Sequence, residues 1–269
     1  MAMPALRFVL SALLCGVAVQ LLSQSAEPSV QLGKVRMEQV HELRKGLDLW
    51  PLIVTPRTTA TQKINATLAE MNGRLRASVH RCDTHYRMWA RNVAEDNRRS
   101  AHPHGDWERK IQVTMVGPRY LSLVVEREVI FCGSAYPNND NYAFVFDLRD
   151  GNLVDPASWF SAEAPVSTRK SATWEENSML LLVDPALESM SRESAVAECR
   201  DAFSQHWGYL IWPDARKQRI IALPAIEQHV LQGCSEKIEL TAEQARRLGF
   251  RDALLRDLLP MPQETQKSK

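Results

Sequence analysis

The chain has 269 residues, enough for one large domain or two small ones. Its 33 basic and 32 acidic residues leave a formal net charge of +1. This balance lacks the positive excess typical of nucleic-acid-binding and membrane-surface proteins, so we expect neither kind of partner. No repeat of fixed period is visible, which argues against solenoids and propellers.

The N-terminal segment, residues 1–26, has the pattern of a secretory signal peptide. Arg7 provides the positive charge, residues 8–22 are apolar, and small residues precede the predicted cleavage point. The apolar stretch is shorter than the roughly 20 residues that cross a bilayer, which favours cleavage over retention as an anchor. Cys15 also allows a lipoprotein signal, although Leu14 is larger than the residue usual before such a cysteine. We therefore predict a periplasmic or secreted protein without a membrane span after cleavage.

Four cysteines remain after removal of this segment: Cys82, Cys132, Cys199 and Cys234. An even number in an exported protein indicates two disulfides, and four cysteines allow three pairings. We favour Cys82–Cys132 with Cys199–Cys234, because each bond then joins a predicted helix to a nearby sheet edge. The alternative, a metal site, usually needs a closely spaced pair such as Cys-x-x-Cys, which is missing here. We predict no metal ion and no cofactor.

The first apolar run of the mature chain is residues 47–54, in which Trp50 and Ile53 are expected to pack on the core. Its proline favours an edge strand or an extended arm. A long helix is predicted to begin at Thr58-Thr59 and to end near Cys82. Its apolar residues recur every three or four positions and form one buried stripe: Ile64, Leu68, Met71, Leu75 and Val79.

This predicted helix also contains the triplet Asn65-Ala66-Thr67, which matches the acceptor sequence for N-glycosylation. Acceptor sites that are used lie in surface loops. A helical position therefore argues against a glycan at Asn65.

A three-stranded antiparallel meander is predicted next. Period-two alternation with many β-branched and aromatic residues indicates strands. The three runs are residues 111–116, 120–131 and 142–147. Gly117-Pro118 and Asp150-Gly151 indicate turns at their ends. The polar residues 91–109 before the meander are predicted to form a surface loop.

The C-terminal half is predicted to mix helices, a hairpin and loops. A loop is expected at 161–172, helices at 174–190 and 191–203, a hairpin from 207–212 and 219–223, and a short strand at 237–240. Thr241 and Gln244 form a capping box that begins a last helix, and residues 261–269 are predicted to be a disordered tail. The predicted fold class is α+β, in which residues 27–260 form one disulfide-stapled domain with the meander packed on the long helix and further helices.

No catalytic constellation is visible, and we assign no catalytic residues. The Gly-x-Ser-x-Gly elbow of many hydrolases is missing, and the histidines at 206 and 229 lie far in sequence from Ser122 and Ser134. Four acids lie near predicted strand ends, where exposed acids are ordinary: Glu126, Glu128, Asp147 and Asp150. Metal-ligand types cluster at residues 80–85, but on a helix they would not share one face.

The polar loop 134–141 between the second and third strands is the most informative candidate for binding. Asn and Asp residues there suit a structured turn. They also suit a recognition loop carried on a rigid sheet. The candidate binding residues are Ser134, Tyr136, Asn138, Asn139 and Asp140.

Residues 132–138 (Cys-Gly-Ser-Ala-Tyr-Pro-Asn) and 146–152 (Phe-Asp-Leu-Arg-Asp-Gly-Asn) resemble a known family. It is the RsiV-like family, the exported domain of the lysozyme-sensing anti-sigma factor and of related secreted or periplasmic bacterial proteins. That family shows a Cys-Gly-Gly-Ala-His-Pro-like segment and then a Phe-Asp-Leu-x-x-Gly-like strand and turn. Here Ser134 replaces the second glycine and Tyr136 replaces the histidine, which puts any ligand role of that histidine in doubt. No cytoplasmic sigma-binding segment is present, so an anti-sigma role is not implied.

The resemblance implies an exported binding or sensing domain more often than an enzyme. We therefore predict a non-catalytic domain that binds a protein, with lysozyme as the example from the resemblance, or a cell-envelope glycan. The first alternative is a hydrolase acting on peptidoglycan or an ester, which needs a pocket where acid, histidine or serine side chains converge. The second alternative is a structural exported domain without a ligand.

Overall fold

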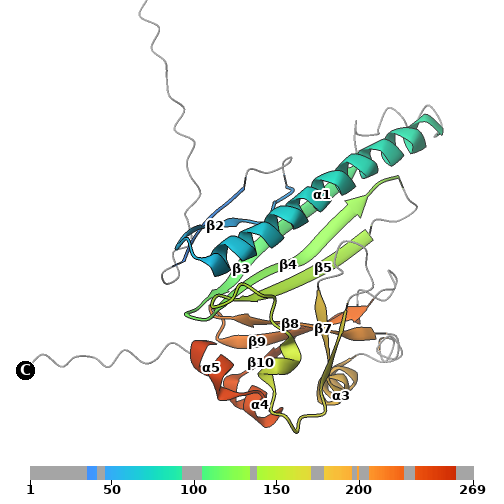
Figure 1. The fold of residues 1–269 in the computed structure, drawn as a ribbon. Helices are drawn as coiled ribbons and strands as arrows, with labels where there is room; N and C mark the ends of the chain where they lie inside the picture. Colours follow the sequence, from blue (N-terminus) through green and yellow to red (C-terminus); the bar gives the residue numbers. More distant parts are fainter. Residues whose placement is uncertain are drawn as a thin grey trace, which may run out of the picture.

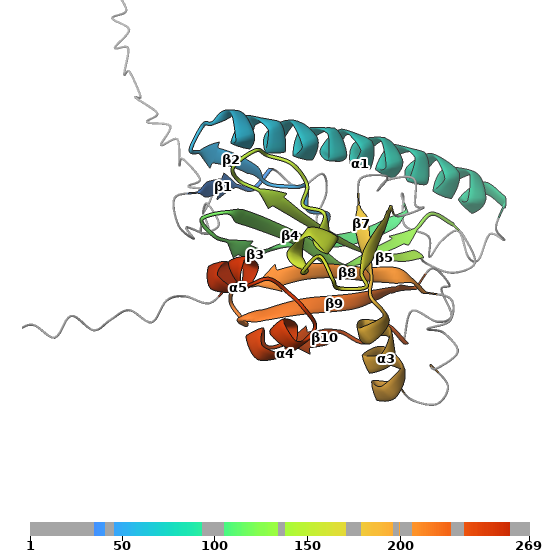
Figure 2. The ribbon, with the colours of Figure 1, turned by 60° about the horizontal axis from the view of Figure 1, so that its bottom comes forward.

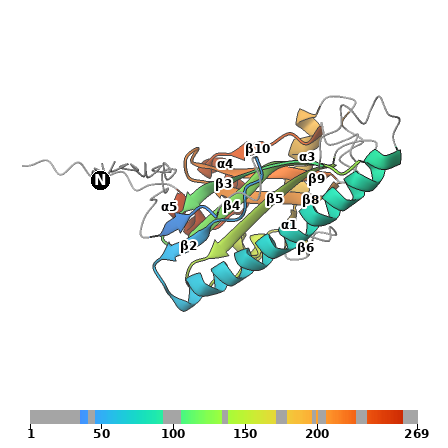
Figure 3. The same ribbon diagram turned by 90° about the horizontal axis from the view of Figure 1, so that it is seen from above.

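The computed structural model describes residues 35–40, 46–92, 105–133, 138–170, 179–195, 199, 206–226 and 234–258. A long helix, α1, covers a three-stranded antiparallel sheet and runs along its strands (Figures 1 and 3). The other face of this sheet packs on a five-stranded antiparallel sheet, and α3 and α4 lie on its far side (Figures 1 and 2). The predicted α+β class is confirmed. The predicted signal peptide and C-terminal tail lie outside the described residues.

The three-stranded sheet is the predicted meander, with the order β3-β4-β5. Two of its boundaries were predicted wrongly, because polar residues join the sheet. Asp106 pairs with Phe131, and Asn138 pairs with Ile130. Parts of the predicted loops 91–109 and 134–141 are therefore strand residues, because they pair with the end of β4. The strands are β3 (Asp106–Val116), β4 (Tyr120–Phe131) and β5 (Asn138–Asp147).

Helix α1 (Thr59–Asn92) begins as predicted but ends ten residues beyond Cys82. Thr58 caps it, because its Oγ1 accepts a hydrogen bond from the Thr61 amide at 3.1 Å. The predicted end was wrong because Tyr86 and Trp89 continue the packing, with both rings edge-on to Phe131 of β4. The predicted stripe is buried apart from the half-buried Met71.

Two asparagines of α1 hold the extended segment that contains β2 (Leu52–Thr55), the partner of the short strand β1 (Arg36–Glu38). Asn72 accepts from the Trp50 amide at 2.7 Å and donates to the Trp50 carbonyl at 2.9 Å. Asn65 pairs in the same way with Ile53, at 2.8 Å for both bonds. Because two helical turns separate the asparagines, both face this segment. Both hydrogen-bonding groups of the Asn65 side chain are therefore used within the folded protein.

The five-stranded sheet has the order β10-β9-β8-β7-β6. The predicted hairpin and the short strand that follows are confirmed as β8, β9 and β10. The helix expected across residues 179–183 is instead strand β7, and the loop expected at 161–172 contains β6. The strands are β6 (Ser167–Lys170), β7 (Leu180–Val183), β8 (His206–Asp214), β9 (Arg219–Ile226) and β10 (Ile238–Leu240).

The remaining helices are short. Asp184 caps α3 by accepting from the Ala186 amide at 2.8 Å, so Asp184-Pro185 ends a strand and starts a helix. The predicted capping box of α4 is confirmed, with the Thr241 Oγ1 accepting from the Gln244 amide at 3.1 Å. The helix expected to begin at 191 was placed wrongly, because residues 191–194 are the end of α3; of the rest of that range the structure describes only residues 195 and 199. The elements are η1 (Pro156–Trp159), α3 (Pro185–Ser194), α4 (Ala242–Arg247) and α5 (Asp252–Leu258).

Both predicted disulfides are confirmed. Cys82 of α1 is bonded to Cys132, the residue after β4. Cys199 is bonded to Cys234, which lies 35 residues further along the chain. Two intramolecular disulfides are compatible with an exported protein. Within the described part of the chain, no helix combines the length and the apolar composition needed to cross a membrane.

Candidate functional site

A row of charged side chains crosses the three-stranded sheet. Arg109 of β3 lies opposite Glu128 of β4, and Glu128 lies opposite Asp140 of β5. Directly opposite residues project from the same face of a sheet. That face is the one under α1, because Arg109 lines a hollow together with Met71 of the helix. Glu128 is 0% exposed and Arg109 is 4% exposed, so these charges lie in the interior.

A β-bulge in β4 turns this row inward. Two β4 residues, Glu126 and Arg127, lie opposite one residue of β3 and one residue of β5. The extra residue reverses which face the following side chains of β4 occupy. Opposite this bulge, the Ile111 amide donates to a carboxylate oxygen of Asp48 at 2.8 Å. This backbone donor is therefore satisfied outside the ladder.

The Glu128 carboxylate is fully buried yet well satisfied. It accepts hydrogen bonds from Trp107 Nε1 at 2.7 Å, Arg109 Nη1 at 3.2 Å and the Tyr142 hydroxyl at 2.5 Å. Three donors and one positive charge offset the loss of water around a buried carboxylate. The expectation that Glu128 is an ordinary exposed acid at a strand end was wrong, because the bulge places it on the inner face.

Asp140 is the part of the row that titrates near neutral pH. Burial raises its pKa to about 6, and the negative charge of Glu128 acts in the same direction. A hydrogen bond with Tyr142 opposes this rise. The Asp140 carboxyl is thus neutral in mildly acidic solution and charged above that range.

Arg109 is the residue that sequence reasoning missed, because it lay in the predicted loop 91–109. Its guanidinium carbon lies 4.6 Å from the ring centre of Trp50 and 5.2 Å from that of Tyr142. Within the described residues its Nε has no hydrogen-bond partner. An arginine shortly before a strongly apolar strand was the available signal, but only the pairing with Glu128 shows its place.

The segment that carries the predicted binding residues is fixed on both sides. On one side Cys132 is bonded to α1, and Gly133 has φ of +85°. A Cβ on Gly133 would lie 2.7 Å from the Trp89 side chain, so a glycine is required there. On the other side Asn138 pairs with the end of β4.

Of the five predicted binding residues, the structure places three. Asn138 and Asn139 are the first residues of β5, and Asp140 belongs to the charged row. Ser134 and Tyr136 lie outside the described residues. The binding role of all five stays a prediction.

The other candidate acids and ligand types do not form a second site. Asp147 is buried rather than exposed, and its carboxylate receives hydrogen bonds from Arg119 and Arg149. Burial acts to raise the pKa of Asp147, but these arginine bonds outweigh it and lower the pKa to about 2. Cys82 of the predicted ligand cluster is in a disulfide. Among the residues that the structure describes, no three His, Cys, Asp or Glu side chains are grouped to hold a metal.

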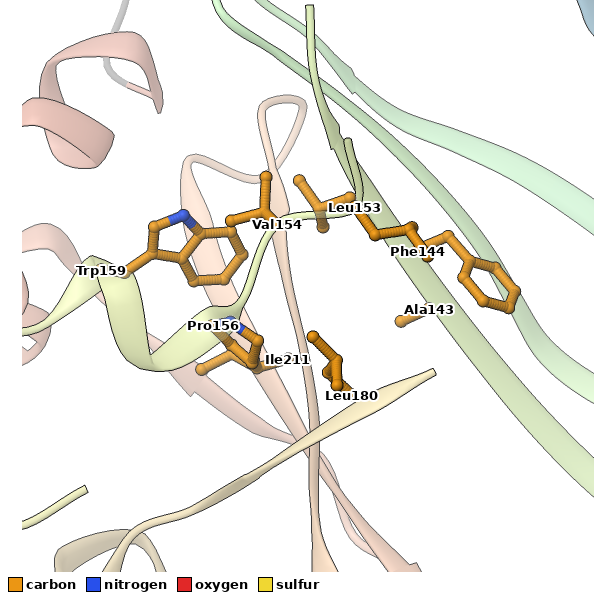
Figure 4. Close-up of a pocket in the computed structure, with 9 residues that line it drawn as sticks. Ala143, Phe144, Leu153, Val154, Pro156, Trp159, Leu180 and Ile211 are labelled. Carbon is orange, nitrogen blue, oxygen red and sulfur yellow. The ribbon is translucent and has the colours of Figure 1, made fainter. Parts of the chain in front are cut away.

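A second hollow lies between the two sheets and is shown in Figure 4. Its lining is apolar and comes from β5, the segment after it, β7 and β8. Such a lining offers packing surface and no group for acid–base chemistry. The labelled residues are Ala143, Phe144, Leu153, Val154, Pro156, Trp159, Leu180 and Ile211.

Compared with known proteins, the chain matches no family model and no curated protein. The relationship to the RsiV-like family therefore stays a prediction that rests on residues 132–138 and 146–152.

Proposed function

We propose that the chain is an exported, non-catalytic binding domain of the RsiV-like type, made with a cleaved signal peptide. It binds a protein or glycan of the cell envelope through the segment from Ser134 to Asp140. The observation that carries this proposal is that the chain is held on both sides of residues 134–137, by the Cys82–Cys132 bond before them and by the pairing of Asn138 after them. A segment held at both ends loses little conformational entropy when it binds, which favours affinity.

The test is a binding measurement with the oxidised mature protein, residues 27–269. Lysozyme, soluble peptidoglycan fragments and an envelope extract are the three probes, and mass spectrometry identifies captured partners. The Tyr136→Ala variant is expected to stay folded and to weaken binding at least tenfold, because an aromatic contact is removed from the centre of the segment. Arg216→Ala, an exposed change in the turn between β8 and β9, is the matched control and is expected to bind normally.

Two results would count against the proposal. Unchanged binding by Tyr136→Ala would remove this segment from the contact surface. If none of the three probes were bound, the proposal of a binding function would be refuted.

A hydrolase is the second candidate, because Asp140, whose pKa is raised to about 6, lies directly opposite a second carboxyl, that of Glu128, and glycoside hydrolases use a pair of carboxyl groups. Its weakness is that Glu128 is 0% exposed and already accepts three hydrogen bonds. The check is release of reducing ends from peptidoglycan, and of p-nitrophenol from its acetate ester. Activity abolished by Asp140→Asn would favour the hydrolase over the binding domain.

A further inference from the structure

A small hollow opens beside the charged row, between α1 and the three-stranded sheet. Its inner wall is aromatic and includes Trp50 and Phe144, whose rings meet edge-on with centres 5.3 Å apart. Met71 and Arg74 of α1 also line it. As described, the enclosed space fits about one water molecule. Because Met71 and Arg74 are long and flexible, the hollow can widen without movement of the backbone.

The charged groups among its lining residues are both guanidinium groups. Arg109 is 4% exposed and donates from Nη1 to Glu128, whereas its Nε has no partner among the described residues. The Arg74 side chain is 43% exposed and pairs with Glu70 one turn earlier on α1. A buried N–H without an acceptor is unfavourable, so an oxygen placed beside it is bound favourably.

We propose that this hollow binds the carboxylate of a small organic acid, with the apolar body of the acid against the aromatic wall. The planar guanidinium fork matches a carboxylate geometrically, and both arginines supply the opposite charge. The aromatic rings suit a flat hydrocarbon body. The site does not depend on the partner-binding segment proposed above, so either proposal can fail alone.

The test titrates the oxidised mature protein with benzoate and, separately, with benzamide, its uncharged analogue of the same shape. Chemical shifts of the tryptophan indole N–H groups report on Trp50, which is assigned with a Trp50→Phe variant. Benzoate is expected to bind saturably, and at least tenfold more tightly than benzamide, because only benzoate offers a charged acceptor.

Three variants locate the site. Met71→Trp fills the hollow without changing a charge and is expected to abolish benzoate binding. Arg109→Lys keeps a positive charge near Glu128 but loses the guanidinium fork, and a loss of about tenfold is expected, in line with one charge-assisted bond. Glu70→Gln frees Arg74 and is expected to strengthen binding a few fold.

The matched control for the last variant is Glu243→Gln, which breaks the similar Glu243–Arg247 pair on α4, away from the hollow. It is expected to leave benzoate binding unchanged. Equal binding of benzoate and benzamide, or unaltered binding by Met71→Trp, would overturn the proposal. No benzoate binding at all would mean that the hollow holds only water.

Discussion

Two carboxyl groups near opposite ends of β5 have pKa values that are shifted in opposite directions. Asp140 lies beside the negative Glu128, and its pKa is raised to about 6 by burial and then by that charge. Asp147 is also buried, but hydrogen bonds from Arg149 and Arg119 hold its pKa at about 2. The same residue type therefore responds to its neighbours rather than to burial alone.

Replacement of Asp140 by Asn is expected to stabilise the protein above pH 6. The folded pKa exceeds the unfolded value of about 3.9, so the folded state binds the extra proton and stability falls as pH rises from about 4 to about 6. Removing the charge should recover about 1–3 kcal/mol at pH 7.5 and almost nothing at pH 4. Urea unfolding at both pH values measures the difference.

Asp147→Asn is the control, with the opposite sign. Its folded pKa lies below the unfolded value, so the ionised group stabilises the protein above about pH 4, and that stability is lost as pH falls towards 2. This variant should lose stability at pH 7.5. Equal stabilisation by Asp140→Asn at both pH values would contradict the explanation by charge.

At the scale of the element, β2 pairs with β1, and side-chain amides of α1 also hold the segment around β2. Asn72→Ala would leave the amide and carbonyl of Trp50 buried without partners, so a loss of about 2–4 kcal/mol is expected. Asn65→Ala is the matched comparison, because Asn65 is partly exposed and water can replace it. Thermal unfolding of both variants tests this, and a larger loss for Asn65→Ala would refute the ranking.

The elements that sequence reasoning predicted well are those whose signals are local. The stripe of α1, the turns of the meander and the Thr241 capping box each depend on residues a few positions apart. Asp106 and Asn138 joined strands only because the end of β4 was available to pair with them. Residues 180–183 are apolar enough for a helix or a strand, and neighbouring strands decided between the two.

The candidate site was less predictable than the fold, since it depends on a β-bulge in β4. Asp140 was named from its loop, but Glu128 was expected to face water and Arg109 was not named. One extra residue between Val125 and Glu128 reverses the side on which Glu128 projects. The apolar–polar alternation of one strand does not indicate where such an extra residue lies. The bulge becomes visible only in the pairing of β4 with its neighbouring strands.

For the molecule as a whole, the two disulfides are expected to stabilise the fold similarly and to differ in function. They span 50 and 35 residues, and each closure contributes about 4 kcal/mol in the chain-entropy model. Replacing both cysteines of either pair by serine should therefore lower the free energy of unfolding by comparable amounts. Denaturant unfolding of the two double variants measures this.

The two double variants are expected to differ in their affinity for the partner. Loss of Cys82–Cys132 frees one side of the segment from Ser134 to Asp140, so affinity for the partner should fall. Loss of Cys199–Cys234 should leave affinity unchanged at a temperature where the variant is folded. Equal loss of affinity in both variants would mean that stability alone controls binding.

The two hydrogen bonds between Asn65 and Ile53 also determine in which kind of host cell the protein can fold correctly. Oligosaccharyltransferases act on chains that have not yet folded, when the Asn65-Ala66-Thr67 triplet is still open. A sugar attached there would take the amide nitrogen that donates to the Ile53 carbonyl, and would place a bulky group between α1 and β2. Production in a host that modifies such triplets would therefore yield misassembled protein, and Asn65→Gln would not repair it because the longer side chain displaces the amide. Correct packing of α1 on β2 therefore requires that this asparagine stays unmodified.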